Sequence, residues 1–288
     1  MLDIVESEFK HIRHPSNIVM QMKTPIRFCT QTCTPLHLVL LNVSLLLSLE
    51  LALEAPALAF MPIIHKEITS EALSSIQFSL DGQPLRFSQR AIQEINSANE
   101  HTDDPAFQTQ SSFHFDNEDF TGGSNRLVKL KERIVKKIIS ENPPAGSARS
   151  DLGGALHTVQ DFYAHSNWVE LGNNGINLDL GRVSFTGADN RAVTCPDDAG
   201  VLGSAGLREL TSGYFLFSQG LCGVPSGKCR HGVKLLGCPS GLNKDDSSRA
   251  GFSKARQLAV LASKDFLDQI LSDPRVVNNL RAVKALMG

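Results

Sequence analysis

The sequence is poor in aromatic residues and carries almost no net charge, and both shortages bear on its partners. Phenylalanine, tyrosine and tryptophan make up 6% of the 288 residues, which disfavours a surface that stacks nucleic-acid bases. The formal net charge is −2, so overall charge gives no reason to expect a polyanionic partner. The chain also lacks internal repeats and shows little period-two alternation of apolar residues, which disfavours repeat architectures and β-rich folds.

Residues 1–59 have the character of a leader segment. A leucine-rich run is followed by "APALA", which offers small residues at the spacing that a signal peptidase reads. We therefore predict a secretory signal peptide cleaved after Ala59, with Met22 as an alternative start, and a secreted or periplasmic protein. The alternative is an uncleaved N-terminal membrane anchor, although residues 36–49 are short for a membrane span and Glu50 interrupts the run.

Cysteine usage agrees with export. Two of the six cysteines lie within the leader, and the other four lie close together in the second half of the chain: Cys195, Cys222, Cys229 and Cys238. No C-x-x-C pair occurs, which disfavours a zinc site made of four cysteines. We predict two disulfides, with the pairing open because four cysteines allow three connectivities.

The remaining chain, residues 60–288, is predicted to form a single, mainly α-helical domain. Apolar residues recur at helical spacing in five segments: 65–80, 86–99, 125–140, 148–167 and 253–271. Residues 172–246 are rich in glycine, proline, serine and asparagine, which predicts a loop-rich insertion that holds all four cysteines.

The most informative segment is "LGGALHTVQDFYAHSNW", residues 152–168, in which His157, Asp161 and His165 are spaced four apart. A spacing of four advances only about 40° around a helix, so the three side chains share one side. Imidazole and carboxylate are ligands that zinc accepts. On its own, the row fits a metal site and a solvated polar helix face equally well.

The other histidines favour a metal site. His65 opens the first predicted helix, and His114 heads "HFDNEDF". His101 lies beside Asp103 and Asp104 in "NEHTDD". Histidine is thus concentrated at element ends and beside carboxylates, which is the donor set of a zinc centre.

Seven segments, in chain order, carry a resemblance to a known family: "FMPIIHKEIT", "NEHTDD", "SSFHFDNEDF", "GGALHTVQDFYAHSNWVELG", "LTSGYF", "KCRHG" and "GLNKD". Together they resemble the heterokaryon-incompatibility (Het-C) family, which is itself similar to zinc-dependent phospholipase C and to S1/P1 nucleases. The resemblance covers nearly all of residues 60–270. It implies a helical phospholipase C/P1 nuclease-like fold with a cluster of zinc ions.

The resemblance also implies the ligands of the first zinc ion. The free amine and carbonyl of Phe60, created by signal cleavage, and the imidazole of His65 would bind this ion. Asp161 would bridge it to a second ion.

The second ion would be held by His114, His157 and an acid of the "HTDD" segment. We favour Asp103 as that acid, with Asp104 as the alternative. The same two carboxylates are the candidate catalytic residues, because either would orient the attacking water or take its proton.

A third ion would begin at His165, but the family's further histidine is missing from "GLNKDDSSRAGFSKARQ". His231 and Glu170 are possible substitutes that the spacing does not compel. We therefore expect two zinc ions and an incomplete third site.

The resemblance favours an exported zinc-dependent phosphodiester hydrolase of phospholipase C type, in which metal-activated water attacks phosphorus. Its substrate would be a phospholipid or another phosphodiester, met at a membrane surface. An S1/P1-type nuclease is the second interpretation; the Phe60-to-His65 spacing favours it, while low aromatic content and charge make nucleic acid the weaker choice. The third is a non-catalytic, metal-stabilised domain that binds membranes or proteins, which the incomplete third site favours.

Overall fold

The computed structural model describes residues 62–80, 82–196, 202–215, 222–233, 237–238 and 240–288. The predicted signal peptide, residues 1–59, and Phe60 lie outside the described residues. No helix in the described ranges is both long and apolar enough to cross a membrane.

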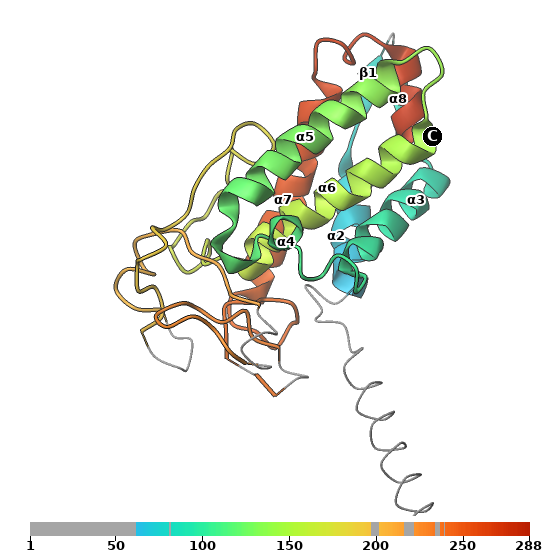
Figure 1. Ribbon diagram of the computed structural model, residues 1–288. Coiled ribbons are helices and arrows are strands. Elements are labelled where there is room, and N and C mark those ends of the chain that lie inside the picture. The colour runs from blue at the N-terminus through green and yellow to red at the C-terminus, as the bar shows by residue number, and fades with distance from the viewer. Residues whose placement is uncertain (1–61, 81, 197–201, 216–221, 234–236, 239) are drawn as a thin grey trace, which may run out of the picture. The chain divides into compact units, whose positions relative to one another are not determined.

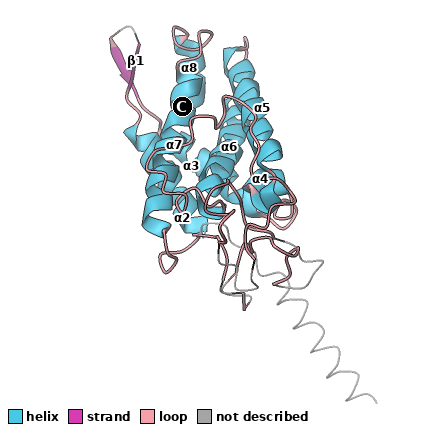
Figure 2. Cartoon of the chain, turned by 90° about the vertical axis from the view of Figure 1, so that its left-hand side faces the viewer, coloured by secondary structure: helices cyan, strands magenta, loops and turns pink. Residues whose placement is uncertain are grey.

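Helices make up most of the regular structure. In chain order they are α2 (Pro62–Ser75), α3 (Gln89–Glu100), α4 (Ser111–His114), α5 (Phe120–Ile139), α6 (Ala145–His165), α7 (Phe252–Leu271) and α8 (Leu280–Met287). Two 3-10 turns, η1 (His101–Asp103) and η2 (Asp116–Glu118), flank α4, and strands β1 (Phe78–Leu80) and β2 (Gln83–Leu85) form an antiparallel hairpin. The prediction of a mainly α class is confirmed (Figure 2).

Helix α6 is the central element of the helical bundle. It lies between α5 and α3 and also packs against α7 (Figure 1). Every residue from 152 to 167 is buried, which is the pattern of a helix enclosed on all sides. The row of His157, Asp161 and His165 is therefore enclosed by protein, and the solvated-face alternative for this row is wrong.

The glycine pair in α6 permits this enclosure. A Cβ on Gly153 would lie 2.4 Å from the carbonyl oxygen of Ile95 and 2.7 Å from the Cβ of Ala98. Only glycine allows helix backbones to approach so closely. The second half of α6 is thereby held tightly against α3, which leads directly into η1.

Aromatic packing fixes the segment between α4 and α5 against α6. The rings of Phe115 and Phe162 meet edge to face at a centroid distance of 5.3 Å, and Phe120 meets Phe162 at 6.3 Å. All three side chains are fully buried. This cluster places His114 and Asp116, which flank Phe115, next to α6.

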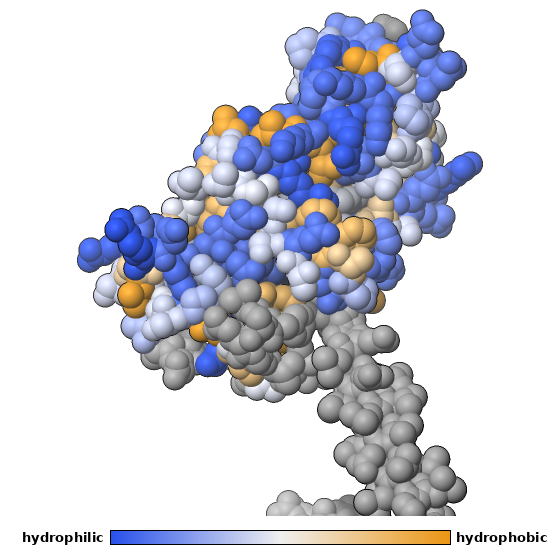
Figure 3. All heavy atoms as spheres, viewed as in Figure 1, coloured by the Kyte–Doolittle hydropathy of each residue, from blue (hydrophilic) through white to orange (hydrophobic). Residues whose placement is uncertain are grey.

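The surface of this bundle is polar on the face that carries α5. Apolar residues are scattered there among hydrophilic ones (Figure 3). The apolar stripe of α5, which includes Leu127, Leu130 and Ile134, is buried. The basic stripe of α5 is thus directed to the outside, as expected for an amphipathic helix.

The loop-rich segment 172–246 contains no helix or paired strand in its described parts, apart from isolated bridges. It carries two disulfides, Cys195–Cys229 and Cys222–Cys238, so the prediction of two disulfides is confirmed. The loops gather where α6 ends (Figure 1). The segment is attached there because the backbone N–H of Lys244 donates to the carbonyl of Ala164 at 2.9 Å.

Three helix predictions need correction. The first helix stops at Ser75, because the "DGQP" turn pairs β1 with β2 and draws the predicted last turn into the hairpin. Helix α5 begins at Phe120 and not at residue 125, because the Asp119 carboxylate accepts a hydrogen bond from the N–H of Gly122 and caps the helix. Helix α8 was not predicted.

Candidate metal centre

Histidines and aspartates from six segments converge beside the second half of α6. They come from α2, η1, α4, η2, α6 and the loop-rich segment, and all are buried: His65, Asp103, His114, Asp116, His157, Asp161, His165, His231 and Asp245. Helix periodicity accounts for three of them, because His157, Asp161 and His165 lie on successive turns. The other six lie on neighbouring segments that pack beside α6.

The first group, here called the central site, consists of Asp103, His114, His157 and Asp161. Oδ2 of Asp161 lies 2.8 Å from Nδ1 of His114 and 2.9 Å from Nε2 of His157. The two imidazole nitrogens are 3.2 Å apart. Oδ1 of Asp103 lies 3.4 Å from Nε2 of His157 and 3.9 Å from Nδ1 of His114.

These spacings match the edges of a zinc coordination tetrahedron. With bonds of about 2.0–2.1 Å, neighbouring ligand atoms in tetrahedral zinc lie roughly 3.3 Å apart. The five distances of the central site scatter around that value, from 2.8 to 3.9 Å. Ligand atoms of Asp103, His114 and His157 all lie within 4.8 Å of one another, so these three side chains can face one cation. Oδ2 of Asp161 lies beside both imidazoles.

His65 approaches the other oxygen of Asp161. Its Nε2 lies 3.3 Å from Oδ1 of Asp161, and its ring stacks on that of His157 with centroids 4.2 Å apart. Asp161 thus faces imidazoles through both oxygens, as a bridging carboxylate does.

The second group, here called the loop site, surrounds His165. Nε2 of His165 lies 3.4 Å from Oδ1 of Asp245, and Nδ1 lies 3.0 Å from Oδ1 of Asp116. The same oxygen of Asp116 lies 3.8 Å from Nε2 of His231. Donor atoms of Asp116, His165 and His231 can be chosen that all lie within 4.8 Å of one another.

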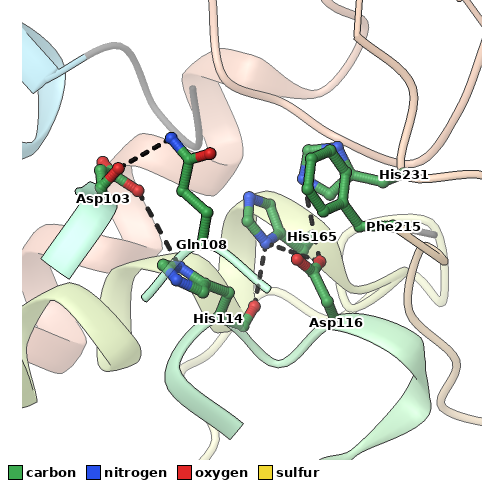
Figure 4. A pocket seen from close by; sticks show the side chains of 7 residues that line it. All are labelled: Asp103, Gln108, His114, Asp116, His165, Phe215 and His231. Atoms are coloured by element: carbon green, nitrogen blue, oxygen red, sulfur yellow. Dashed lines mark hydrogen bonds and ion pairs between the residues drawn. The ribbon is translucent and has the colours of Figure 1, made fainter. Parts of the chain in front are cut away.

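A small cavity separates the central site from the loop site. Its volume is about 10 Å³, close to the space that one water molecule needs. It is lined by Asp103, Gln108, His114, Asp116, His165, Phe215 and His231 (Figure 4). Both sites therefore face a shared space that a water molecule can enter.

Four imidazoles share one hydrogen-bonding pattern that determines which nitrogen faces the carboxylates. Nδ1 of His65 lies 2.6 Å from Oε1 of Gln160, and Nδ1 of His157 lies 3.1 Å from Oδ1 of Asn99. Nδ1 of His165 lies 2.9 Å from the carbonyl oxygen of His114.

In His114 the roles of the two nitrogens are exchanged, because Nε2 lies 3.3 Å from the carbonyl oxygen of Phe107. Since each of these oxygens accepts a hydrogen, the anchored nitrogen of each ring carries the proton. In the neutral imidazole, the opposite nitrogen has a lone pair that faces the centre, which is how histidine is oriented for metal binding.

Three carboxylates of the centre, those of Asp103, Asp116 and Asp161, form ion pairs only with histidine among the described residues. Both oxygens of Asp103, and Oδ1 of Asp116 and of Asp161, accept no hydrogen bond from described residues. Burying such oxygens is costly unless a cation compensates them.

The pKa values describe a strongly negative centre. Burial alone would lower the pKa of His157, but the charges of Asp161 and Asp103 outweigh it and raise that pKa to about 10. Burial alone would also lower the pKa of His165. The charges of Asp116 and Asp161 outweigh burial and hold that pKa well above its usual value. The pKa of Asp161 is held well below its usual value because His157 and His165 overcome the effect of burial. The centre therefore attracts cations, whether protons or metal ions.

An unusual backbone holds Asp116 in the loop site. Phe115, Asn117 and Glu118 all adopt left-handed conformations, with φ of 54°, 56° and 59°. Such conformations are costly for residues other than glycine and cluster at functional sites. They are maintained by contacts with the loop segment, since the N–H of Asn117 donates to Gly213 and that of Glu118 donates to Ser212.

Most of the predicted ligands meet in this centre. His65, Asp103, His114, His157, Asp161 and His165 lie together, whereas Phe60 lies outside the described residues. Asp104 is exposed and pairs with His101, so it does not join the centre. Glu170 pairs with Lys244 at 3.1 Å and is no ligand of the loop site.

The structure adds residues that sequence reasoning missed. Asp116 and Asp245 were not proposed, and His231 was proposed only as a substitute. The one available signal for Asp116 was its position in "HFDNEDF", two residues after His114. Asp245 lies near the end of the loop-rich segment, where no periodicity indicates the direction of a side chain.

Comparison with known proteins identifies relatives of this chain. Residues 68–277 match the family model of the VWA7 N-terminal domain. The chain is 33% identical over 257 residues to the von Willebrand factor A domain-containing protein 7 of Rattus norvegicus, covering 80% of this chain and 28% of that protein. The Mus musculus and Homo sapiens proteins of that name are 34% and 33% identical, over 77% and 78% of this chain. The chain spans only 26–28% of the length of these relatives.

These matches overturn the resemblance on which the enzymatic interpretation rested. The assignment to the Het-C family was wrong, because the family model and the relatives are those of VWA7. The phospholipase C-like hydrolase and the nuclease are withdrawn with it. The catalytic roles predicted for Asp103 and Asp104 are not tested by these matches. No solved structure matches the chain, so the phospholipase C/P1 nuclease-like fold is also unsupported.

Proposed function

The chain belongs to the family of the VWA7 N-terminal domain, and we propose that it binds divalent metal ions, zinc foremost, in the buried centre around Asp161. One observation carries this proposal: four imidazoles are each anchored through one nitrogen and turn the other toward buried carboxylates. The proposal rests on the donor set and its geometry, and not on the earlier family resemblance.

The donor geometry supports two principal ions. Nε2 of His157 can serve one ion alone, because its Nδ1 is engaged by Asn99. The central site would use Asp103, His114, His157 and Asp161, and the loop site would use His165 with acids and His231. His65 with Oδ1 of Asp161 offers a partial set for a third ion.

The proposed role of the metal is to add a polar connection between segments that meet at α6. The central site connects η1 and α4 to α6, and the loop site connects η2 and the loop segment to α6. Because the ligands are assembled only in the folded chain, metal binding would add directly to the free energy of unfolding. The domain would act as a metal-stabilised module of a longer protein.

We place this module in an exported compartment. Two disulfides within the described residues support that location, because disulfides persist in oxidising compartments. Zinc binding in such a compartment would use histidine and aspartate, which do not compete with disulfide formation as cysteine ligands would.

Metal analysis of matched variants tests the proposal. Purified protein would be stripped with a chelator, reloaded with zinc, desalted and analysed for zinc, iron and manganese by mass spectrometry. We expect about two zinc ions per chain, and fewer in Asp103→Asn. Asp104→Asn is the matched control, because this carboxylate is adjacent in sequence but points to the surface. Absence of stoichiometric metal from the reloaded native protein would refute the proposal.

A further inference from the structure

A groove outside the metal centre carries a second inference. It lies along α4 and the first half of α5 and has a volume of about 430 Å³, within the range of small-molecule sites. Its lining residues are Ser112, Phe113, Asp119, Gly122, Asn125, Arg126, Lys129, Leu130 and Arg133.

Arg126 is the central residue of this groove. Its guanidinium stacks on the ring of Phe113, 3.4 Å from the centroid, and its Nε donates to Oγ1 of Thr158 at 3.1 Å. Among the described residues it has no carboxylate partner. Burial, with a smaller contribution from the charge of Arg133, lowers the pKa of Arg126 to about 10. A guanidinium has five N–H donors, and the described residues accept a hydrogen bond from only one of them.

The surroundings of Arg126 offer further donors and one acid, Asp119, which keeps its charge while it caps α5. Ser112, Asn125 and Lys129 make no side-chain hydrogen bond or ion pair with the described residues. The two charged groups of opposite sign at the rim are already engaged. Asp119 caps α5 at the N–H of Gly122, and Arg133 forms a two-point pair with Asp151.

A structural role for Arg126 explains part of this arrangement. Stacking on Phe113 and the bond to Thr158 fasten α4 to α6, which helps to place His114. This role leaves the terminal nitrogens of the guanidinium without an acceptor among the described residues. It also does not explain why three more donors line the same groove.

We propose that this groove binds the anionic group of a small molecule, a carboxylate or a phosphate-type oxyanion. The planar fork of an arginine matches both groups through paired hydrogen bonds. Lys129 lies one helical turn from Arg126 and adds a second charge, and Asn125 and Ser112 add neutral donors. Phe113 and Leu130 provide an apolar wall for the body of the ligand. The inference is independent of the metal centre.

Anion titration of the oxidised, zinc-loaded full chain tests the inference. Inorganic phosphate, sulfate and acetate would each be titrated by calorimetry at constant ionic strength, so that general screening is equal in all arms. We expect saturable binding of at least one anion, weakened about tenfold or more in Arg126→Lys, which keeps the charge but loses the fork. Lys129→Ala is expected to weaken binding about threefold or more.

Two controls make the outcome decisive. Lys136→Ala removes the same charge from the same helix, away from the groove and beside Glu132, and should leave binding unchanged. Asp161→Asn should change the binding of an anion at the metal centre and leave the binding of an anion in the groove unchanged. This variant therefore distinguishes the two places. Lys129 forms no hydrogen bond or ion pair with a described residue, so its variant stays informative if Arg126→Lys disturbs α4. Absence of saturable binding, or binding unchanged in both groove variants, would overturn the inference.

Discussion

Asp161 and His157 lie one turn apart on α6, and Oδ2 of Asp161 lies 2.9 Å from Nε2 of His157. Both side chains are fully buried. Oδ1 of the same carboxylate faces His65 at 3.3 Å and His165 at 3.9 Å. Asp161 therefore joins all parts of the centre, and its charge helps to raise the pKa of His157 and of His165.

Replacement of Asp161 by asparagine should remove zinc. The amide would keep the volume and lose the charge, so the central site would have one carboxylate in place of two. We expect Asp161→Asn to retain at least one zinc ion fewer than the native protein, because a buried cation needs anionic compensation. Mass spectrometry of the desalted protein measures the ratio. Full zinc occupancy in this variant would show that the carboxylate is structural.

Replacement of Gly153 should destabilise the α3–α6 contact. A Cβ there would overlap the carbonyl oxygen of Ile95 at 2.4 Å, and backbone atoms cannot yield easily. We expect Gly153→Ala to lower the free energy of unfolding by about 2 kcal/mol or more. Urea denaturation followed by circular dichroism measures this difference.

Gly146 is the matched control in the same helix. The nearest atom to a Cβ at Gly146 is Oε2 of Glu94, at 4.0 Å. Gly146→Ala should therefore be neutral or stabilise the protein by about 0.5–1 kcal/mol, because alanine favours the helix. Equal effects of the two substitutions would contradict the close approach.

The helical bundle was largely predictable because its pattern is local. Apolar spacing located α3, α6 and α7 to within about three residues at each end. The hairpin escaped because "IQFSL" continues a helical pattern, while its structure is decided by pairing with residues beyond the turn. Helix α8 covers only eight residues, and so short an element depends on packing more than on its own propensity.

The candidate centre was predictable where ligands lie on one helix or beside a histidine. The row on α6 followed from periodicity alone. The choice between Asp103 and Asp104 could not be settled by spacing, because the 3-10 turn η1 ends at Asp103 and Asp104 follows it with an extended backbone. Asp116 depends on a left-handed backbone that the loop segment enforces, which no local rule indicates. The family resemblance misled because shared metal-ligand patterns do not establish common function.

Acidification should remove the stabilising contribution of Asp151. Arg133 and Lys137 lower the pKa of this carboxyl despite partial burial, which raises it. Because the folded-state pKa lies below the unfolded value, the contribution is fully present above about pH 4. It is lost as the pH falls through the folded-state pKa. We expect the free energy of unfolding of the native protein to exceed that of Asp151→Asn by about 1 kcal/mol near neutral pH. This difference should shrink in acid.

The comparison with Asp151→Asn separates this effect from loss of metal. If zinc is bound, both proteins would lose it on acidification, so the metal contribution would cancel in their difference. Urea denaturation at a series of pH values from about 3 to 7 supplies that difference. A difference that stays constant with pH would contradict the role assigned to the Asp151 carboxylate.

The last prediction concerns the Cys195–Cys229 disulfide, which holds His231 in place. His231 follows Cys229 by two residues, and Tyr214 links them: its N–H donates to the Cys229 carbonyl, and its carbonyl accepts from the His231 N–H. The disulfide is buried with Leu242 in a small apolar cluster of its own. Without it, the described loop around His231 would depend chiefly on backbone hydrogen bonds.

A buried ion pair also connects the same segment to η2, the 3-10 turn that contains Asp116. Lys228, next to Cys229, donates to Glu118 at 2.7 Å, and Glu118 lies two residues after Asp116. Loosening the disulfide would therefore disturb both His231 and Asp116 in the loop site. The central site would keep its ligands, because they lie on η1, α4 and α6.

Removal of this disulfide should accordingly cost one zinc ion and leave the other. Loss of the crosslink, which closes a loop with a sequence separation of 34, should also destabilise the domain by about 3 kcal/mol. The paired variant Cys195→Ser with Cys229→Ser would be loaded with zinc and analysed for bound metal. The corresponding replacement of Cys222 and Cys238 is the control, because that crosslink lies farther along the chain from Lys228. Unchanged zinc in the first variant would show that the loop site holds its geometry without the disulfide. Loss of all zinc would show that the two sites cannot be filled separately.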